Sequence, residues 1–292
     1  MEITTSFDNI TITAHVKESK IKKLKYIIEN EVAIYVKRSS FDRFEAFTKS
    51  GNSEILHISY DKIKGQAFQA RPFRLEFNPN KLRDKDISIY KDIISLLYDI
   101  TISRLDLAFD IFDVDCSKFV FEKLERNVKS SYYLSASGVL ETKYLGARKS
   151  EKRARLYNKK IERTENGGVE DNIFASKYKH WWRLEFQLRS RSVDNVFEII
   201  DEYIFKPQDF SDLSIDNQMK ISIFLNDKNL WGKLSRNTRS KYKKILKNYS
   251  TNDIDYKSLL RKDLNENRDR LEKQLRQYAG REEFEMILDK IK

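Results

Sequence analysis

Cysteine and histidine are scarce in this chain of 292 residues. The single cysteine, Cys116, excludes an intrachain disulfide and a zinc site built from several thiolates. The three histidines, His15, His57 and His180, lie far apart and in no paired ligand spacing. A catalytic metal ion would therefore have to be bound mainly by carboxylates.

Long apolar runs are also missing. No stretch approaches the roughly 20 apolar residues that a membrane-spanning helix needs. The first thirty residues lack the basic start and the unbroken apolar stretch of a signal peptide. Together with the single cysteine, these absences predict a soluble protein of the reducing cytoplasm.

Positive charge is in excess, with 56 lysines and arginines against 45 acidic residues and a net charge of +11. Such an excess points to a polyanionic partner, with nucleic acid ahead of an acidic membrane surface. A generically basic surface would give the same composition, so the distribution of the charges has to decide.

Hydrophobic periodicity predicts an α+β fold, a curved antiparallel β-sheet with helices on one face. Strands are expected at 8–15, 44–60, 73–77, 102–112, 132–134, 142–146, 153–159 and 181–189. Helices are expected at 84–99 and at about 118–126. The 40% of hydrophobic residues is enough to bury a substantial core.

The pattern changes to helices near Pro207, with expected helices at about 214–225, at about 236–247 and from about 256 to the end. We therefore predict a catalytic α+β domain over residues 1–205. Residues 206–292 are predicted to form a helical, basic region for DNA recognition or dimerisation.

Alternate residues of four predicted strands place polar side chains on one face of the sheet. Three of these residues, Asp106, Glu185 and Glu76, would supply hard oxygen ligands for Mg²⁺ or Mn²⁺. Tyr157 lies between Arg155 and Lys159, so it is the candidate nucleophile, and its two basic neighbours would contact phosphate oxygens.

The same pattern has a second interpretation. The solvated face of any antiparallel sheet is polar, and its charges commonly form ordinary cross-strand ion pairs. With 15 tyrosines in the chain, periodicity by itself does not select Tyr157.

Five short motifs follow one another along the chain, at 74–82, 104–110, 141–148, 155–160 and 182–185. In this order and spacing they resemble the Rep_trans family, the replication initiators of small rolling-circle plasmids in Gram-positive bacteria. The likeness continues through Trp231-Gly232-Lys233-Leu234 and the basic helix that follows, so it covers nearly the whole chain.

The resemblance implies that Tyr157, in an Arg-x-Tyr-x-Lys segment, is the tyrosine that nicks one strand of plasmid origin DNA. Nicking would leave a 5′-phosphotyrosine and a 3′-hydroxyl that primes synthesis, and the strand would be rejoined at termination. Asp106, Glu185 and Glu76 are carried over as ligands of Mg²⁺ or Mn²⁺. The resemblance also implies a homodimer and a host superfamily-one helicase as partner.

Basic residues crowd the predicted helix at 236–247, and no acidic residue occurs from Lys228 to Asn252. A solvated basic helix has this composition too, but the resemblance favours binding to origin duplex DNA. The candidate DNA-binding residues are Lys233, Arg236, Arg239, Lys241, Lys243, Lys244 and Lys247.

Two other functions remain open at this point. A relaxase of a conjugative element would use the same catalytic domain for DNA transfer. A non-catalytic origin-binding protein would carry the polar face only as a surface.

Overall fold

The computed structural model describes residues 2–32, 35–39, 42–50, 53–124, 128–207, 213–226, 228–248 and 254–282. Its strands are β1 (Glu2–Val16), β2 (Tyr35–Ser39), β3 (Arg43–Ser50), β4 (Ser53–Asp61), β5 (Phe73–Phe77), β6 (Leu97–Phe112), β7 (Phe119–Lys123), β8 (Ser130–Leu134), β9 (Leu140–Leu145), β10 (Lys152–Asn158), β11 (Trp181–Arg189) and β12 (Tyr203–Pro207).

The α-helices are α1 (Ile21–Ile27), α2 (Lys62–Ala67), α3 (Asp84–Ile94), α4 (Lys159–Asn166), α5 (Val169–Ser176), α6 (Ile215–Asn226), α7 (Lys228–Lys233), α8 (Arg236–Asn248), α9 (Tyr256–Glu266) and α10 (Arg268–Tyr278). A 3-10 segment, η5 (Ser190–Glu202), follows β11.

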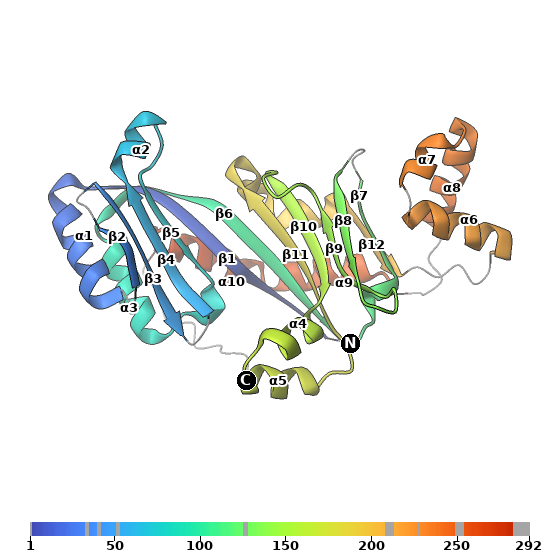
Figure 1. The fold of residues 1–292 in the computed structure, drawn as a ribbon, viewed down its shortest axis with the longest axis horizontal. Coiled ribbons are helices and arrows are strands. Elements are labelled where there is room, and N and C mark those ends of the chain that lie inside the picture. The colour runs from blue at the N-terminus through green and yellow to red at the C-terminus, as the bar shows by residue number, and fades with distance from the viewer. Residues whose placement is uncertain are drawn as a thin grey trace.

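Ten strands form one sheet in the order β2-β3-β4-β5-β1-β6-β11-β10-β9-β8 (Figure 1). Every neighbouring pair in it is antiparallel, which confirms the predicted fold class. The long strands β1 and β6 form its middle. Their pairing is interrupted by a β-bulge between Phe7 and Asn9, where an extra residue bends the strand and re-aims a side chain.

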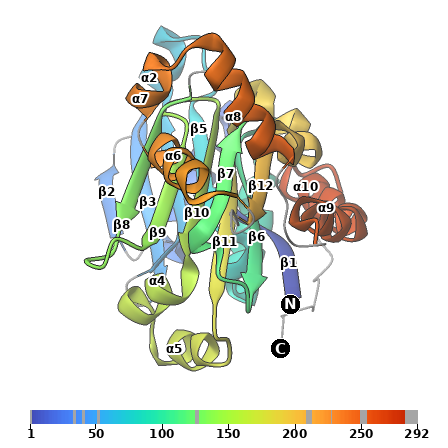
Figure 2. The ribbon, with the colours of Figure 1, turned by 90° about the vertical axis from the view of Figure 1, so that its right-hand side faces the viewer.

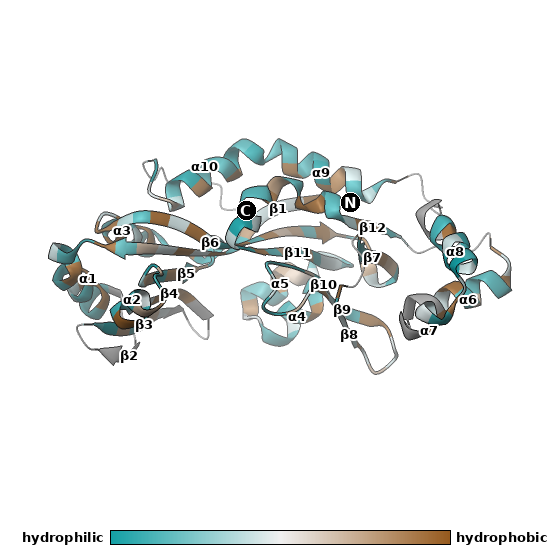
Figure 3. Ribbon diagram, turned by 90° about the horizontal axis from the view of Figure 1, so that it is seen from above, coloured by the Kyte–Doolittle hydropathy of each residue, from teal (hydrophilic) through white to brown (hydrophobic). Residues whose placement is uncertain are grey.

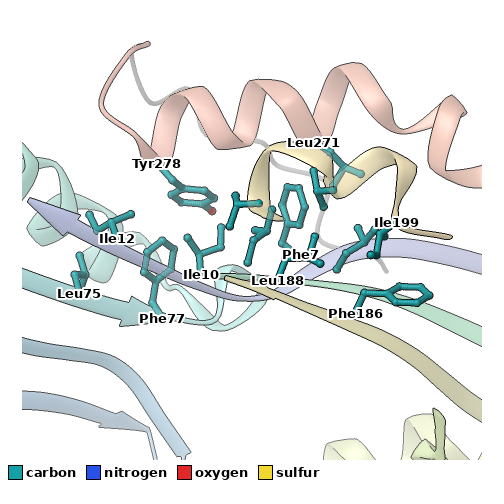
Figure 4. Packing of buried hydrophobic residues seen from close by; sticks show 14 of the residues in the cluster. Phe7, Ile10, Ile12, Leu75, Phe77, Phe186, Leu188, Ile199, Leu271 and Tyr278 are labelled. Carbon is teal, nitrogen blue, oxygen red and sulfur yellow. The ribbon is translucent and has the colours of Figure 1, made fainter. Parts of the chain in front are cut away.

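One face of the sheet is covered by helices and carries the core. Ile10 and Ile12 of β1 lie on this face and are fully buried. Leu271 and Tyr278 of α10 lie above them in Figure 4, and the Tyr90 hydroxyl of α3 donates to the Tyr278 carbonyl oxygen at 2.5 Å. The opposite face is concave, because the strands at both ends of the sheet bend away from α9 and α10 (Figure 3).

The helices that follow β12 take two different places. α6, α7 and α8 lie beyond the end of the sheet, whereas α9 and α10 return along its covered face (Figures 1 and 2). The predicted division near residue 205 stays a prediction, and residues 283–292 lie outside the described residues. Every helix in the described part of the chain is too short or too polar to span a lipid bilayer.

The helix predicted at about 118–126 is wrong for the residues that the structure describes. Residues 119–123 form β7, which pairs with β12 in a separate two-stranded sheet. Phe119, Val120 and Phe121 are aromatic or β-branched and all three are buried, so the partner strand decides the conformation of a segment with strong strand propensity. Residues 125–127 lie outside the described residues.

We predict that Leu264→Ala in α9 lowers the free energy of unfolding by about 2–5 kcal/mol, because Leu264 is fully buried and truncation leaves a cavity. Lys262→Ala, two residues away with a side chain that is 71% exposed, should change it by less than about 0.5 kcal/mol. Urea unfolding measures both variants. Equal effects would show that α9 does not pack on the sheet.

Candidate active site

The concave face carries the polar residues that strand alternation predicts. In the register of β10 and β11, Tyr157 lies opposite Arg183 and Arg155 lies opposite Glu185. In the register of β11 and β6, Gln187 lies opposite Asp106. Partners in an antiparallel ladder project to the same side of the sheet, so the predicted site residues of the central strands share one face.

A cavity of about 420 Å³ opens on this face, and we call it the central cavity. Its walls reach from β4 to β9 across the sheet and include carboxylates, guanidinium groups, a lysine, a histidine and amides. The acidic lining residues are Asp8, Glu76, Asp106 and Glu185, and the basic ones are Lys81, Arg104, Arg153 and Arg155. The lining is therefore highly charged but balanced in sign.

The carboxylates that were predicted to bind metal form ion pairs with arginines. Arg104 contacts Asp106 (Nη2 to Oδ2, 2.5 Å) and also Glu76 (Nη1 to Oε1, 3.2 Å). Arg155 contacts Glu185 (Nη2 to Oε2, 2.7 Å). Burial, together with the charge of Glu185, raises the pKa of Asp106 to about 6 although Arg104 opposes the shift.

These residues do not fit a divalent metal ion in the arrangement described. Their oxygens are the hard donors that Mg²⁺ and Mn²⁺ prefer. Among the described residues, however, no three acidic, histidine or cysteine side chains are grouped to hold an ion. Binding would require Arg104 and Arg155 to leave their carboxylates, and the metal requirement stays a prediction.

Tyr157 is buried among cations beside the central cavity. Its side chain is 4% exposed, the Arg155 Cζ lies 3.9 Å from its ring centroid, and the Lys159 Nζ lies 5.4 Å from it. Burial raises the pKa of Tyr157 above its ordinary value, although the charges of Arg183 and Arg155 oppose the shift. The phenol therefore stays protonated at neutral pH in the free protein.

Lys159 begins α4 directly after β10 and is also buried. Burial and the charge of Arg183 lower its pKa to about 8, although its ion pair with Glu162, at 2.7 Å, opposes the shift. A lysine with this pKa can hold or release a proton near neutral pH, which an ordinary surface lysine does not do.

Arg183 holds the site together through two carboxylates that sequence reasoning did not single out. Its guanidinium donates to Asp110 from Nε at 2.8 Å and from Nη2 at 2.6 Å. The remaining Nη1 donates to Asp8 at 2.7 Å. The Trp181 indole also donates to Asp110, at 2.7 Å, and Arg183 itself is only 5% exposed.

Asp8 could not be placed by strand alternation. Counting by two puts Asp8 on the same face as Ile10 and Ile12, which are buried under the helices. The β-bulge at this point turns Asp8 to the concave face, where it lines the central cavity. No residue type in this segment is typical of a bulge, so the local sequence does not predict it.

The comparisons with known proteins agree on replication initiation. Residues 9–97 match the family model described as "Replication initiation protein, N-terminal". A replication initiation protein of Staphylococcus aureus is 35% identical over 272 residues, covering 92% of this chain and 84% of the relative. A second one from the same species is 34% identical and covers 92% and 82%. The chain belongs to the replication initiation proteins.

Membership of this family confirms the prediction of a replication initiator, while the Rep_trans assignment stays a prediction. A solved structure titled "Structure of Rolling Circle Replication Initiator Protein from Geobacillus stearothermophilus" covers 73% of this chain and 90% of its own. It is 16% identical, with a TM-score of 0.44.

The predicted DNA-binding residues of this initiator lie on α8 and at the end of α7, and both helices lie beyond β12 at the end of the sheet (Figure 1). Tyr242 is buried, and its hydroxyl hydrogen-bonds to Asn217 of α6 at 3.3 Å. Lys233, Arg236, Lys241, Lys243 and Lys244 are exposed and Arg239 is half-buried, whereas the side chain of Lys247 lies outside the described residues. α8 therefore packs through Tyr242 and presents basic groups to solvent.

We predict that Arg183→Met lowers the free energy of unfolding by about 3–5 kcal/mol, because it leaves two carboxylates without their buried cation. Arg74→Met removes a half-exposed ion pair with Glu76 and should cost no more than about 1 kcal/mol. Thermal or urea unfolding compares the two. A similar small loss for both would contradict the role assigned to Arg183.

Proposed function

We propose that this replication initiator starts rolling-circle replication of a plasmid by nicking one strand of the origin with Tyr157. The observation that carries the proposal is a buried tyrosine with Arg155 and Lys159 beside its ring, next to a charged cavity. Of the two cations, Arg155 lines the cavity and would meet a phosphate-rich strand there. The order of the motifs along the chain supports the same assignment.

The reaction would be a transesterification. The Tyr157 oxygen attacks the scissile phosphorus, the bond from phosphorus to the 3′ oxygen breaks, and the phenol loses its proton. The leaving 3′ oxygen takes up a proton and becomes the primer hydroxyl, while the 5′ phosphate stays on the tyrosine. The phosphotyrosine conserves the energy of the bond, so attack by a 3′-hydroxyl at termination rejoins the strand without ATP.

The cations beside the tyrosine would stabilise the charge that develops on the phosphoryl oxygens and on the phenolate. Arg155 and Lys159 suit this role because both contact the ring of Tyr157. Tyr157 is buried and its pKa is raised in the free protein, so its activation would accompany DNA binding. Mg²⁺ or Mn²⁺, a homodimer and a host superfamily-one helicase are proposed from the family resemblance.

Recognition of the duplex origin is assigned to α8. Exposed lysines and arginines that carry no carboxylate partner among the described residues would mostly contact phosphates, so affinity should fall steeply with salt. α8 lies beyond β12 (Figure 1), apart from the strands whose residues line the central cavity. One surface would therefore hold the duplex while the other receives an extruded single strand.

We predict that Tyr157→Phe binds origin DNA as the unsubstituted protein does but nicks it at least about a thousandfold more slowly, because the nucleophile is gone. Relaxation of a supercoiled plasmid that carries the origin, with Mg²⁺ or Mn²⁺ present, measures nicking. Tyr98→Phe, a half-exposed tyrosine of β6, should nick normally. Nicking by the Tyr157 variant at the ordinary rate would show that Tyr157 is not the nucleophile.

We predict that replacing Lys243 and Lys244 together by alanine weakens binding to origin duplex and makes the negative slope of log affinity against log salt shallower by about 2. The matched control replaces Lys22 and Lys23, two exposed lysines that follow one another in α1. It should leave the duplex affinity and its salt dependence unchanged. Fluorescence anisotropy across a salt series measures them. Unchanged duplex binding in the α8 variant would place recognition elsewhere.

A further inference from the structure

The concave face continues past the central cavity onto the hairpin of β8 and β9 at the edge of the sheet. A second hollow of about 520 Å³ lies there, and we call it the edge hollow. It is lined by Lys129, Ser131, Tyr133, Tyr144, Gly146, Arg148 and Arg153. Tyr144 and Arg153 line the central cavity as well, so the two spaces adjoin.

Strand register puts the lining of the edge hollow on the face that carries Tyr157. Tyr157 of β10 lies opposite Thr142 of β9, which in turn lies opposite Tyr133 of β8. Ser131 lies opposite Tyr144, one step further along the same hairpin. The row of side chains therefore runs without interruption from the tyrosine nucleophile to the edge of the sheet.

At the open end of the hairpin, β9 is followed by Gly146, whose φ of +97° is strained for any other residue. A Cβ at this position would also lie 2.7 Å from the carbonyl oxygen of Lys152. The amide of Gly146 donates to the Lys129 carbonyl oxygen at 2.8 Å. This tight ending holds Lys129 and Arg148 at the same end of the hollow.

The edge hollow offers an aromatic surface that faces solvent. Tyr133 is 56% exposed, and its ring meets that of Tyr144 edge to face with centroids 5.9 Å apart. The guanidinium of Arg153 lies over the Tyr144 ring at 4.2 Å. The ring of Tyr144 is thus in contact with both Tyr133 and Arg153. The ring of Tyr133 contacts Tyr144 on one side, and its exposed surface leaves room for a planar group to stack.

The charge of the edge hollow is positive and uncompensated. Its lining includes three basic residues and no carboxylate. Within the described part of the chain, none of Lys129, Arg148 and Arg153 forms an ion pair, and the buried Nε of Arg153 has no hydrogen-bond partner. Burial and the charges of Arg148 and Arg155 lower the pKa of Arg153. An anion placed in the hollow would relieve this repulsion.

We propose that the edge hollow binds unpaired nucleotides of the single strand next to the scissile phosphate, with Tyr133 stacking on a base and Lys129, Arg148 and Arg153 contacting the backbone. Aromatic surfaces combined with a basic groove are how proteins bind single-stranded nucleic acid. The bases of an intact duplex are already stacked on one another and cannot use Tyr133. The assignment of the neighbouring phosphate as scissile rests on the proposed nicking function.

Binding of single-stranded DNA tests the proposal without requiring any cleavage. The full-length Tyr157→Phe protein is titrated into a labelled oligothymidine of roughly 15 nucleotides, long enough for a typical single-strand site, and into a labelled duplex of the same length. Adding Tyr133→Ala should weaken binding of the single strand about fivefold or more. Binding of the duplex should not change, and Tyr133→Trp should restore the single-strand affinity.

Tyr132→Ala is the matched control, because Tyr132 is the next residue on β8 and projects to the other face, where it contacts Lys143. It should leave the binding of the oligothymidine unchanged. Arg148→Ala should weaken single-strand binding and lower its salt dependence. Circular dichroism and unfolding of each variant verify that the hairpin change leaves the fold intact.

Unchanged single-strand affinity in Tyr133→Ala would overturn the proposal, as would an equal loss in Tyr132→Ala. If Arg148→Ala weakens binding of both DNA forms while Tyr133→Ala does nothing, the edge hollow is a simple phosphate site and the stacking proposal is wrong. Failure of the nicking function would look different. The protein with its native Tyr157 would then form no covalent DNA adduct, although the effect of Tyr133→Ala on oligothymidine binding would persist.

Discussion

The buried guanidinium of Arg183 is the interaction on which the rest of the site depends. It joins β11 to Asp110 of β6 and to Asp8 at the bulge of β1, so three central strands meet at one cation. A buried guanidinium that donates hydrogen bonds to a carboxylate on each side is held in one orientation. Tyr157 lies directly opposite Arg183 in the ladder, and its position therefore depends on this link.

In the free protein, the site is neutralised internally. Arg104 and Arg155 are paired with Asp106, Glu76 and Glu185, and burial keeps the phenol of Tyr157 protonated. An incoming phosphate strand adds negative charge and competes with these carboxylates for the arginines. The edge hollow and α8 both present clustered cations that have no acidic partner among the described residues. We infer that these surfaces attract DNA first and that the paired site reorganises afterwards.

Local periodicity was enough to predict most strands of the large sheet and its polar face, but not β2, β7 or β12. The strands at 73–77 and 181–189 begin and end where the alternation of polar and apolar residues predicts, because a period of two is a property of the segment itself. The position of Asp8 depends on a bulge, and the strand at 119–123 depends on pairing with β12. The pairs of Arg155 with Glu185 and of Arg183 with Asp110 depend on which strands are neighbours. Such features arise from distant segments, and no local pattern contains them.

The identity of the residue that becomes joined to DNA decides whether Tyr157 is the nucleophile. The protein can be trapped on a single-stranded origin oligonucleotide, digested with trypsin and analysed by mass spectrometry for a nucleotide-bearing peptide. We expect one adduct, a 5′-phosphate ester on Tyr157. An adduct on Tyr144 or on another tyrosine, or tight binding with no adduct in the presence of Mg²⁺ or Mn²⁺, would contradict it.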